Sequence, residues 1–117
     1  MTDVHPNTRY QTEGKKLTGT TKTACLVTGA GSYMEVTGGT VCASAGSAGN
    51  LTVYWYDAST DTEFTVAYEV EVPAVGNLRL AFDPVHMDPA DEIRLAGENN
   101  MHVILSYIGA GRNLGIR

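Results

Sequence analysis

The stretch DEIRLAGENNMHVILSYI, residues 91–108, decides the fold class of this chain. In its first part Ile93 and Leu95 alternate with polar residues, which is the pattern of a strand with one buried face. The letters GENN that follow are turn formers, since Gly and Asn tolerate a positive φ angle. The returning segment, 101–108, is apolar on both faces, as in a strand that is central in its sheet or covered on its second side. The stretch therefore predicts a β-hairpin whose second strand is central in its sheet or is covered on its second face.

The two faces of this second strand carry different residues. Val103, Leu105 and Tyr107 share one face, which we assign to the core, and Ile104 and Ile108 lie on the opposite face. A lone two-layer sandwich leaves that opposite face open. We therefore expect a homo-oligomer, a trimer or a ring, because closed symmetry is the usual way to bury such a face.

The remaining segments point to the same fold class. The chain has 117 residues, which is long enough for one domain with its own hydrophobic core. It contains 13 Gly, and no window shows the sustained periodicity of a helix. Residues 51–56 and 63–72 alternate around a turn and predict an antiparallel hairpin, and 20–28 and 33–44 predict another. We expect an all-β chain with a single antiparallel β-sandwich of seven or eight strands, immunoglobulin-like or jelly-roll-like. A small barrel is the alternative.

The sequence divides into three parts. Residues 1–17 are polar and lack periodicity, so we expect an extended N-terminal arm that is ordered only against a partner. Residues 18–110 form the sandwich and 111–117 a C-terminal tail. Within the sandwich, Gly38-Gly39 predicts a bulge or a close approach of two backbones.

Charge is distributed unevenly along the chain. The net charge is −5, and the acidic residues concentrate between residues 57 and 98, which argues against a nucleic-acid partner. Both ends are mildly basic, and we expect them to dock onto an acidic protein neighbour, although solvated tails are the alternative. The candidate contact residues at the two ends are Arg9, Tyr10, Lys15, Lys16, Leu114, Ile116 and Arg117.

Cysteine usage and hydropathy suggest a compartment. The first ten residues lack the apolar segment of a signal peptide, and no apolar run approaches membrane-spanning length. We therefore expect the chain to fold in a reducing cytosol, with Cys25 and Cys42 as free thiols and no membrane partner.

Motifs that carry chemistry are weak. The Gly-rich segments 29–31 and 109–115 lack the spacing of nucleotide-binding loops, so they predict turns. Asp83, His86, Asp88 and Asp91 could ligate a divalent ion, but Asp beside Pro is also ordinary turn chemistry. We expect no catalytic residues, no cofactor and no metal, and hence no enzyme.

Aromatic residues support one alternative of a different class. Trp55 is expected to fill the core, where its indole N–H needs a partner. Tyr54 and Tyr56 lie on the opposite face of their strand, and together with Tyr68 they could form a carbohydrate-binding platform or cover a neighbouring segment.

Residues 50–108 resemble a recurrent class of small virion proteins of tailed bacteriophages. The likeness rests on the hairpin letters LTVYWYD and EFTVAYEVEVPA, on DEIRL (residues 91–95) and on VILSYI (residues 103–108). It implies a non-enzymatic structural protein located in the virion and assembled in the host cytoplasm. Its partners would be the major capsid protein or other virion proteins. The implied role is a capsid decoration or cement protein, with a neck, head–tail connector or tail accessory protein as the alternative. The N-terminal arm and the tail GRNLGIR depart from the pattern.

Overall fold

The structure, a computed structural model, describes residues 9–44 and 46–111. This part of the chain is built from nine β-strands and has no helix that is long and apolar enough to cross a membrane. The strands are β1 (Arg9–Leu17), β2 (Thr23–Val27), β3 (Ser32–Ala43), β4 (Gly49–Asp57), β5 (Thr62–Val72), β6 (Leu78–Leu80), β7 (Val85–Met87), β8 (Glu92–Gly97) and β9 (Met101–Gly111).

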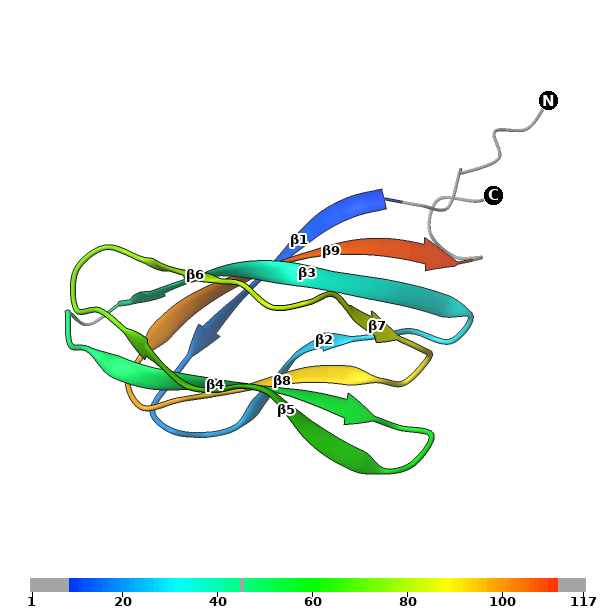
Figure 1. Cartoon of the computed structure of the whole chain (residues 1–117), viewed down its shortest axis with the longest axis horizontal. Helices are drawn as coiled ribbons and strands as arrows, with labels where there is room; N and C mark the ends of the chain where they lie inside the picture. The colour runs from blue at the N-terminus through cyan, green and yellow to red at the C-terminus, as the bar shows by residue number, and fades with distance from the viewer. Residues whose placement is uncertain (1–8, 45, 112–117) are drawn as a thin grey trace.

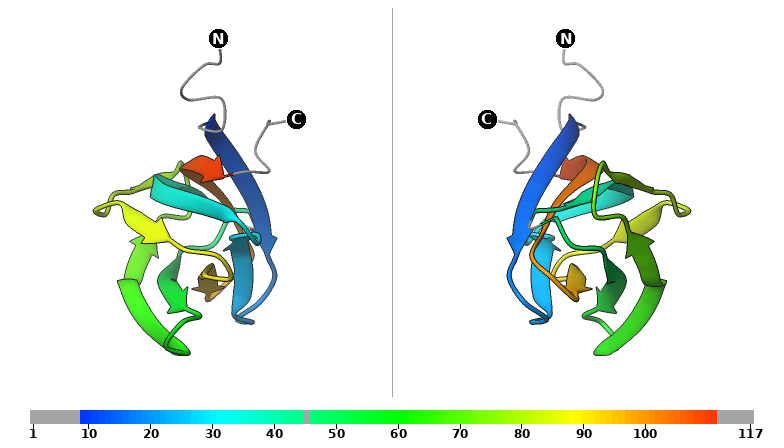
Figure 2. Two further views of the ribbon diagram at one scale, coloured as in Figure 1. Left: turned by 90° about the vertical axis from the view of Figure 1, so that its right-hand side faces the viewer. Right: turned by 90° about the vertical axis from the view of Figure 1, so that its left-hand side faces the viewer.

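The strands form two antiparallel sheets that pack face to face (Figures 1 and 2). The five-stranded sheet has the order β1-β9-β3-β6, and β7 also pairs with β3. The four-stranded sheet has the order β2-β8-β4-β5. Most connections cross between the sheets, and the resulting order is that of a jelly roll in which β6 and β7 together occupy one strand position. The predicted all-β sandwich is confirmed, with nine strands in place of seven or eight.

The stretch 91–108 forms two strands but not the predicted hairpin. β8 pairs with β2 and β4, whereas β9 pairs with β1 and β3 in the other sheet. The hairpin prediction is therefore wrong, because residues 98–100 carry the chain across the sandwich. The inner side chains of both strands, such as Leu95 and Val103, lie in the core, where two sheets bring their apolar faces together. The prediction that β9 is central is confirmed, since β1 and β3 flank it.

The predicted hairpin between residues 20–28 and 33–44 is wrong for the same reason. β2 pairs with β8, and β3 pairs with β9, β6 and β7. Leu26 and Val36 are both buried in the core but come from opposite sheets. Cys25 and Cys42 are free thiols, as predicted.

Residues 9–17 are an edge strand of the five-stranded sheet rather than an arm. β1 pairs with β9 over nine consecutive residues, from Arg9 opposite Gly109 to Leu17 opposite Met101. The boundary of the predicted arm is wrong for these residues. Their polar composition hides the strand because one face of β1 is open to solvent, and among residues 10–17 only Leu17 is buried. Residues 1–8 of the predicted arm lie outside the described residues.

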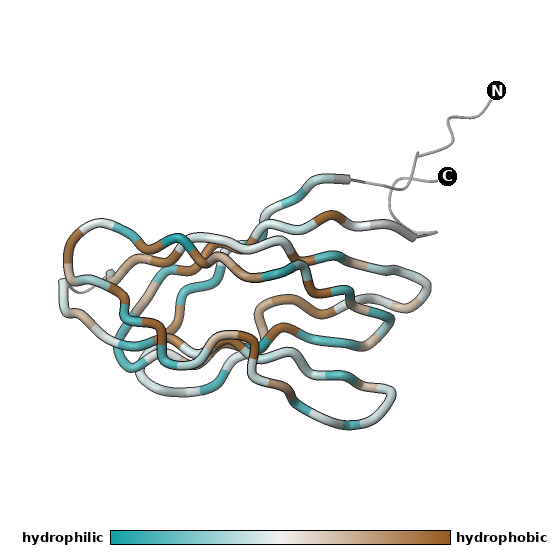
Figure 3. The backbone as a smooth tube through the Cα atoms, in the orientation of Figure 1, coloured by the Kyte–Doolittle hydropathy of each residue, from teal (hydrophilic) through white to brown (hydrophobic). Residues whose placement is uncertain are grey.

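The core lies between the two sheets and is continuous. Brown and teal segments alternate along the strands in Figure 3, as expected for strands with one buried face. Trp55 packs against the margin of the core and stacks on Phe64, with ring centroids 5.2 Å apart. Its buried indole N–H finds no hydrogen-bond partner among the described residues. The buried hydrophobic residues of the core are Leu17, Leu26, Val36, Val41, Leu51, Val53, Val72, Leu80, Met87, Ile93, Leu95, Met101, Val103, Leu105 and Tyr107.

The predicted hairpin of β4 and β5 is confirmed, but its alternation is not regular. The pairing shifts twice, between Leu51 and Val53 and between Val53 and Tyr54. Glu69 adopts a positive φ of 46°, which fits a bulge in β5. The alternation expected of residues 63–72 is therefore interrupted at this bulge, and Tyr68 is exposed.

The predicted irregularity at Gly38-Gly39 is confirmed. The register between β3 and β9 shifts between Val36 and Gly38, and Gly38 has a φ of 132°. A Cβ atom at Gly39 would collide with the backbone carbonyl oxygen of Ile104 on β9. Gly39 thus allows the central strands β3 and β9 to approach closely beside the bulge.

Candidate interaction surface

The outer face of the five-stranded sheet gathers several of the predicted contact residues. Residues that lie opposite each other in an antiparallel pair point to the same face. Tyr10 on β1 lies opposite Ile108 on β9, and Gly14 lies opposite Ile104. Since the intervening residues of β9 face the core, these four residues belong to the outer face.

Ile104 is the apolar centre of this face. Its side chain is 51% exposed. Its neighbours across the sheet are Gly14 on β1 and Thr40 on β3, and neither is large enough to cover it. Tyr10 is 87% exposed, and Ile108 opposite it is half-buried. A large apolar side chain surrounded by small residues offers a contact point to another protein.

Small residues also hollow this face. A depression of about 390 Å³ lies where β3 separates from β6, and one of about 360 Å³ lies between β1 and β9. The two share Thr37 and Ser106 in their walls. A third, also about 360 Å³, is lined by Gly14 and Ile104 among other residues. The face is therefore uneven enough to accept protruding side chains from a partner.

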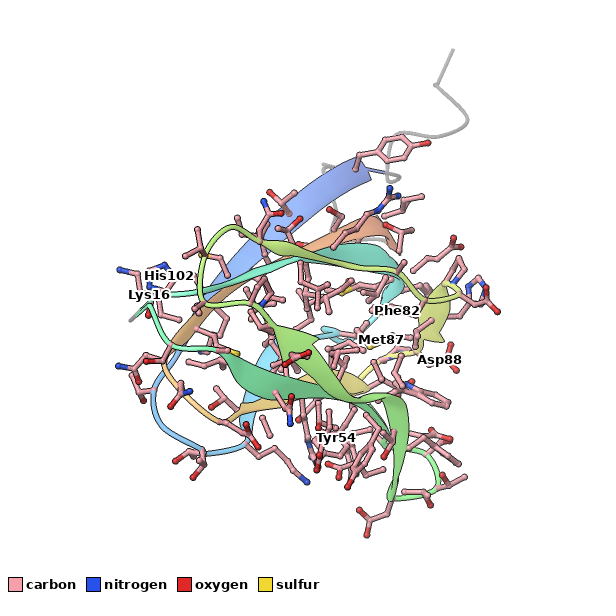
Figure 4. The ribbon with its side chains drawn as sticks, turned by 60° about the vertical axis from the view of Figure 1, so that its left-hand side comes forward. Lys16, Tyr54, Phe82, Met87, Asp88 and His102 are labelled. Carbon is pink, nitrogen blue, oxygen red and sulfur yellow. The ribbon has the colours of Figure 1, made fainter. Side chains whose placement is uncertain are left out.

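Cationic side chains flank Ile104. Lys16 lies opposite His102 in the next outward-facing row, and Figure 4 shows the two at one end of the sandwich. Arg79 on β6 belongs to the same row as Ile104, beyond Thr40, and is exposed. Glu35 lies opposite Ile108 on the same face, so the face carries both signs of charge around Ile104. An apolar centre with Lys16 and Arg79 beside it fits a protein surface that offers carboxylates around an apolar contact.

Lys15 does not join Lys16 on this face. Strand alternation turns it to the inner side of β1, where it is half-buried near Cys25 and Glu13. Both lysines were predicted to contact an acidic neighbour, and the structure places them on opposite faces of β1. Burial, followed by the nearby Glu13 carboxylate, raises the pKa of the Cys25 thiol to about 11, whereas Lys15 acts in the opposite direction.

Cys25 is therefore expected to react slowly with alkylating reagents. Only the thiolate reacts, so raising the pKa from 9.0 to about 11 lowers the thiolate fraction near neutral pH about a hundredfold. The measurement is the rate of iodoacetamide labelling in a Cys42→Ser background, followed by mass spectrometry. The rate should increase with pH up to about 11 and increase strongly in urea. Equal rates in folded and unfolded protein would contradict this assignment.

The tyrosines proposed for carbohydrate binding lie on the outer face of the four-stranded sheet. The Lys22 ammonium lies 4.1 Å from the centre of the Tyr54 ring, and the Arg94 guanidinium lies 4.0 Å from that of Tyr56. One side of each ring is thus covered by a cation of the same chain. Tyr68 differs, being 71% exposed.

Carboxylates complete the charge pairing on this second face. Glu63 accepts hydrogen bonds from Lys22 at 2.7 Å and from Arg94 at 3.1 Å, and Arg94 also donates to Glu92. The Lys22 hydrogen bond is the main reason why the pKa of Glu63 lies below its usual range. The polar groups of this face are thus largely paired with one another.

The residues considered as metal ligands are dispersed. Asp91 is buried, with its two carboxylate oxygens accepting from the backbone N–H groups of Ala58 at 2.9 Å and Asp88 at 3.0 Å. His86 faces Glu35 on β3, at 3.4 Å between Nδ1 and Oε1. Residues 9–44 and 46–111 contain no group of three or more ligating side chains placed to hold a metal ion.

The structure does not place the side chains of some predicted contact residues. Leu114, Ile116 and Arg117 lie outside the described residues, and Arg9 is placed only as the first residue of β1. The sequence also missed His102 and Arg79 as neighbours of Ile104. The sequence of β1 predicts a strand only weakly. Its inward-facing positions are Gln11, Glu13, Lys15 and Leu17, and only Leu17 among these is apolar.

Comparison with models of known protein families, with curated proteins and with solved structures finds no match to this chain. The resemblance to tailed-phage virion proteins therefore stays a prediction.

Proposed function

We propose that this chain is a non-enzymatic structural protein of a tailed-phage particle that decorates or cements the outer capsid surface. The contact is made by the outer face of the five-stranded sheet, with Ile104 inserted into the partner and Lys16 and Arg79 meeting carboxylates around it. The observation that carries the proposal is the half-exposed Ile104 on a hollowed, mildly basic face. Interface anchors of this kind are apolar side chains enclosed by a polar rim.

The fold is compatible with this role but does not select it. Jelly rolls occur in viral capsid proteins and also in lectins, and the fold alone does not decide between functions. In our proposal the partner is the major capsid protein, and the chain reaches the virion in the host cytoplasm. A neck, head–tail connector or tail accessory position would use the same face against another virion protein.

Carbohydrate binding is the candidate from a different class, favoured by the exposed Tyr68 on the other outer face. Sugar stacking needs an open aromatic face, and Lys22 and Arg94 already occupy one side of Tyr54 and Tyr56. This arrangement favours the structural role over the sugar-binding one.

Two measurements test the proposed function. Particles of the phage whose genome encodes the chain are purified on a density gradient, and mass spectrometry quantifies the chain relative to the major capsid protein. We expect the ratio of the chain to the major capsid protein to be constant across the fractions of the particle band. A glycan array probed with the wild-type protein and with Tyr68→Ala is the companion measurement. Absence from the particle band, or glycan binding that Tyr68→Ala abolishes, would overturn the proposal.

A further inference from the structure

β1 is a long edge strand whose protection against strand addition comes from its charged side chains alone, Arg9, Glu13, Lys15 and Lys16. It pairs with β9 in one unbroken register, and no described strand lies on its other side. It contains no proline and no bulge, and Figure 2 shows it at the margin of the molecule. Such an edge presents a row of unpaired N–H and C=O groups to which a further strand can add.

The other edges of the described sheets are guarded. β5 is interrupted by two shifts of register between it and β4. β2 has only five residues and a register shift at Cys25, and β6 and β7 have three residues each. Short strands and bulges discourage strand addition. Among the described strands, β1 is the one suited to it.

The charges of β1 fit a second copy of the same strand. An antiparallel pair of identical strands has a two-fold axis perpendicular to the sheet, passing between equivalent residues. With the axis at Gly14, Glu13 of each copy lies opposite Lys15 of the other. Opposite charges directly across two strands stabilise the pairing, and the symmetry supplies this pair twice.

Neighbouring registers are less favourable. A two-fold axis at Glu13 places the two Glu13 carboxylates opposite each other. A two-fold axis at Lys15 places the two Lys15 ammonium groups opposite each other. An axis at Thr12 sets Lys15 opposite Arg9. Like charges directly across two strands are destabilising, so the axis at Gly14 is preferred among these four positions.

We propose that two copies of this chain join through antiparallel pairing of β1 with β1, centred on Gly14, into one continuous sheet. Because the axis is perpendicular to the sheet, the outer faces of both copies lie on the same side, and the two Ile104 side chains face the same partner. The pair has two-fold symmetry, and we propose it in place of the trimer or ring expected from the sequence. It does not depend on the proposed function, because dimerisation is measured without particles.

Charge reversal tests the pairing directly. Glu13→Lys gives a chain with two lysines at the contact, and Lys15→Glu gives one with two glutamates. Each variant alone should dimerise at least about tenfold more weakly than wild type, since attraction becomes repulsion in two pairs. Mixing the two variants should restore a dimer, and so should the double variant Glu13→Lys/Lys15→Glu. Glu71→Lys, a matched reversal on the β5 edge, should dimerise like wild type in analytical ultracentrifugation.

Cross-linking tests the register. In a Cys25→Ala/Cys42→Ala background, Gly14→Cys should form a disulfide-linked dimer on mild oxidation, because residues opposite each other have Cα atoms about 4.5–5.5 Å apart. Thr12→Cys is the matched control and should remain uncross-linked, since Thr12 lies opposite Lys16 of the second copy. A wild-type protein that stays monomeric at its highest soluble concentration would overturn the proposal. So would a dimer that Glu13→Lys leaves unchanged, or one cross-linked through Thr12→Cys and not through Gly14→Cys.

Discussion

Replacing Gly39 by alanine is expected to lower the free energy of unfolding by about 3 kcal/mol, the cost of forcing an atom into a packed core. The added Cβ would collide with the carbonyl oxygen of Ile104 and lie 3.1 Å from the Cα atom of Leu105. Both atoms belong to the backbone of β9, the central strand, so no side chain can rotate to make room. The strands must separate, which weakens the pairing of β3 with β9.

Urea denaturation followed by tryptophan fluorescence measures this effect. Gly29→Ala is the matched control, because a Cβ there would meet only the Ser32 hydroxyl oxygen at 3.9 Å. We expect the control to change the free energy of unfolding by less than about 0.5 kcal/mol, as for other unstrained surface positions. Similar losses in both variants would mean that β3 and β9 do not approach as closely as described.

Asp91→Ala is expected to destabilise the protein by a comparable amount, about 3 kcal/mol. The carboxylate is 2% exposed and accepts from the backbone N–H groups of Ala58 and Asp88. These bonds join the turn between β4 and β5 to the loop between β7 and β8. Alanine removes both acceptors and leaves two part-buried backbone donors without partners, which costs more than the bonds themselves contribute.

Asp88→Ala is the control for this prediction, because the Asp88 side chain is exposed and lies in the same loop. Its effect on the free energy of unfolding should be less than about 0.5 kcal/mol, as at other surface sites. Asp91→Asn keeps one acceptor oxygen and should fall between the two. The account of this loop is wrong if Asp88→Ala and Asp91→Ala unfold at the same urea concentration.

The sequence predicted the strands better than their pairing. The alternation of apolar and polar residues identifies strands such as β8 and β9 within residues 91–108. Successive side chains of a strand point to opposite faces, so burial of one face leaves a period of two in the sequence. The same pattern arises whether a turn returns the chain to its own sheet or carries it across the core. Residues 98–100 look like a hairpin turn by composition, but they connect two sheets. Whether the chain stays in one sheet or crosses to the other is decided by how the inner faces of the two sheets pack, and the local sequence does not encode that packing.

The candidate surface was predictable only in part. The opposite faces of β9 separated Ile104 and Ile108 from the core residues, and the structure leaves Ile104 half-exposed. Its surroundings could not be predicted, because Gly14, Thr40 and Arg79 come from three other strands. β1 was not predicted as a strand, because an edge strand with one face open to solvent needs few apolar residues.

The central claim is that the outer face of the five-stranded sheet binds the phage particle, and one comparison tests it most directly. Labelled protein is sedimented with particles from a phage whose own copy of the gene is disrupted. Ile104→Asp and Val27→Asp introduce the same charge at residues of similar exposure, 51% and 54%, on opposite outer faces. We predict that wild type and Val27→Asp sediment with particles alike, whereas Ile104→Asp is recovered at least about tenfold less, as for loss of an interface anchor. Equal recovery of the two variants, or no sedimentation of wild type, would contradict the claim.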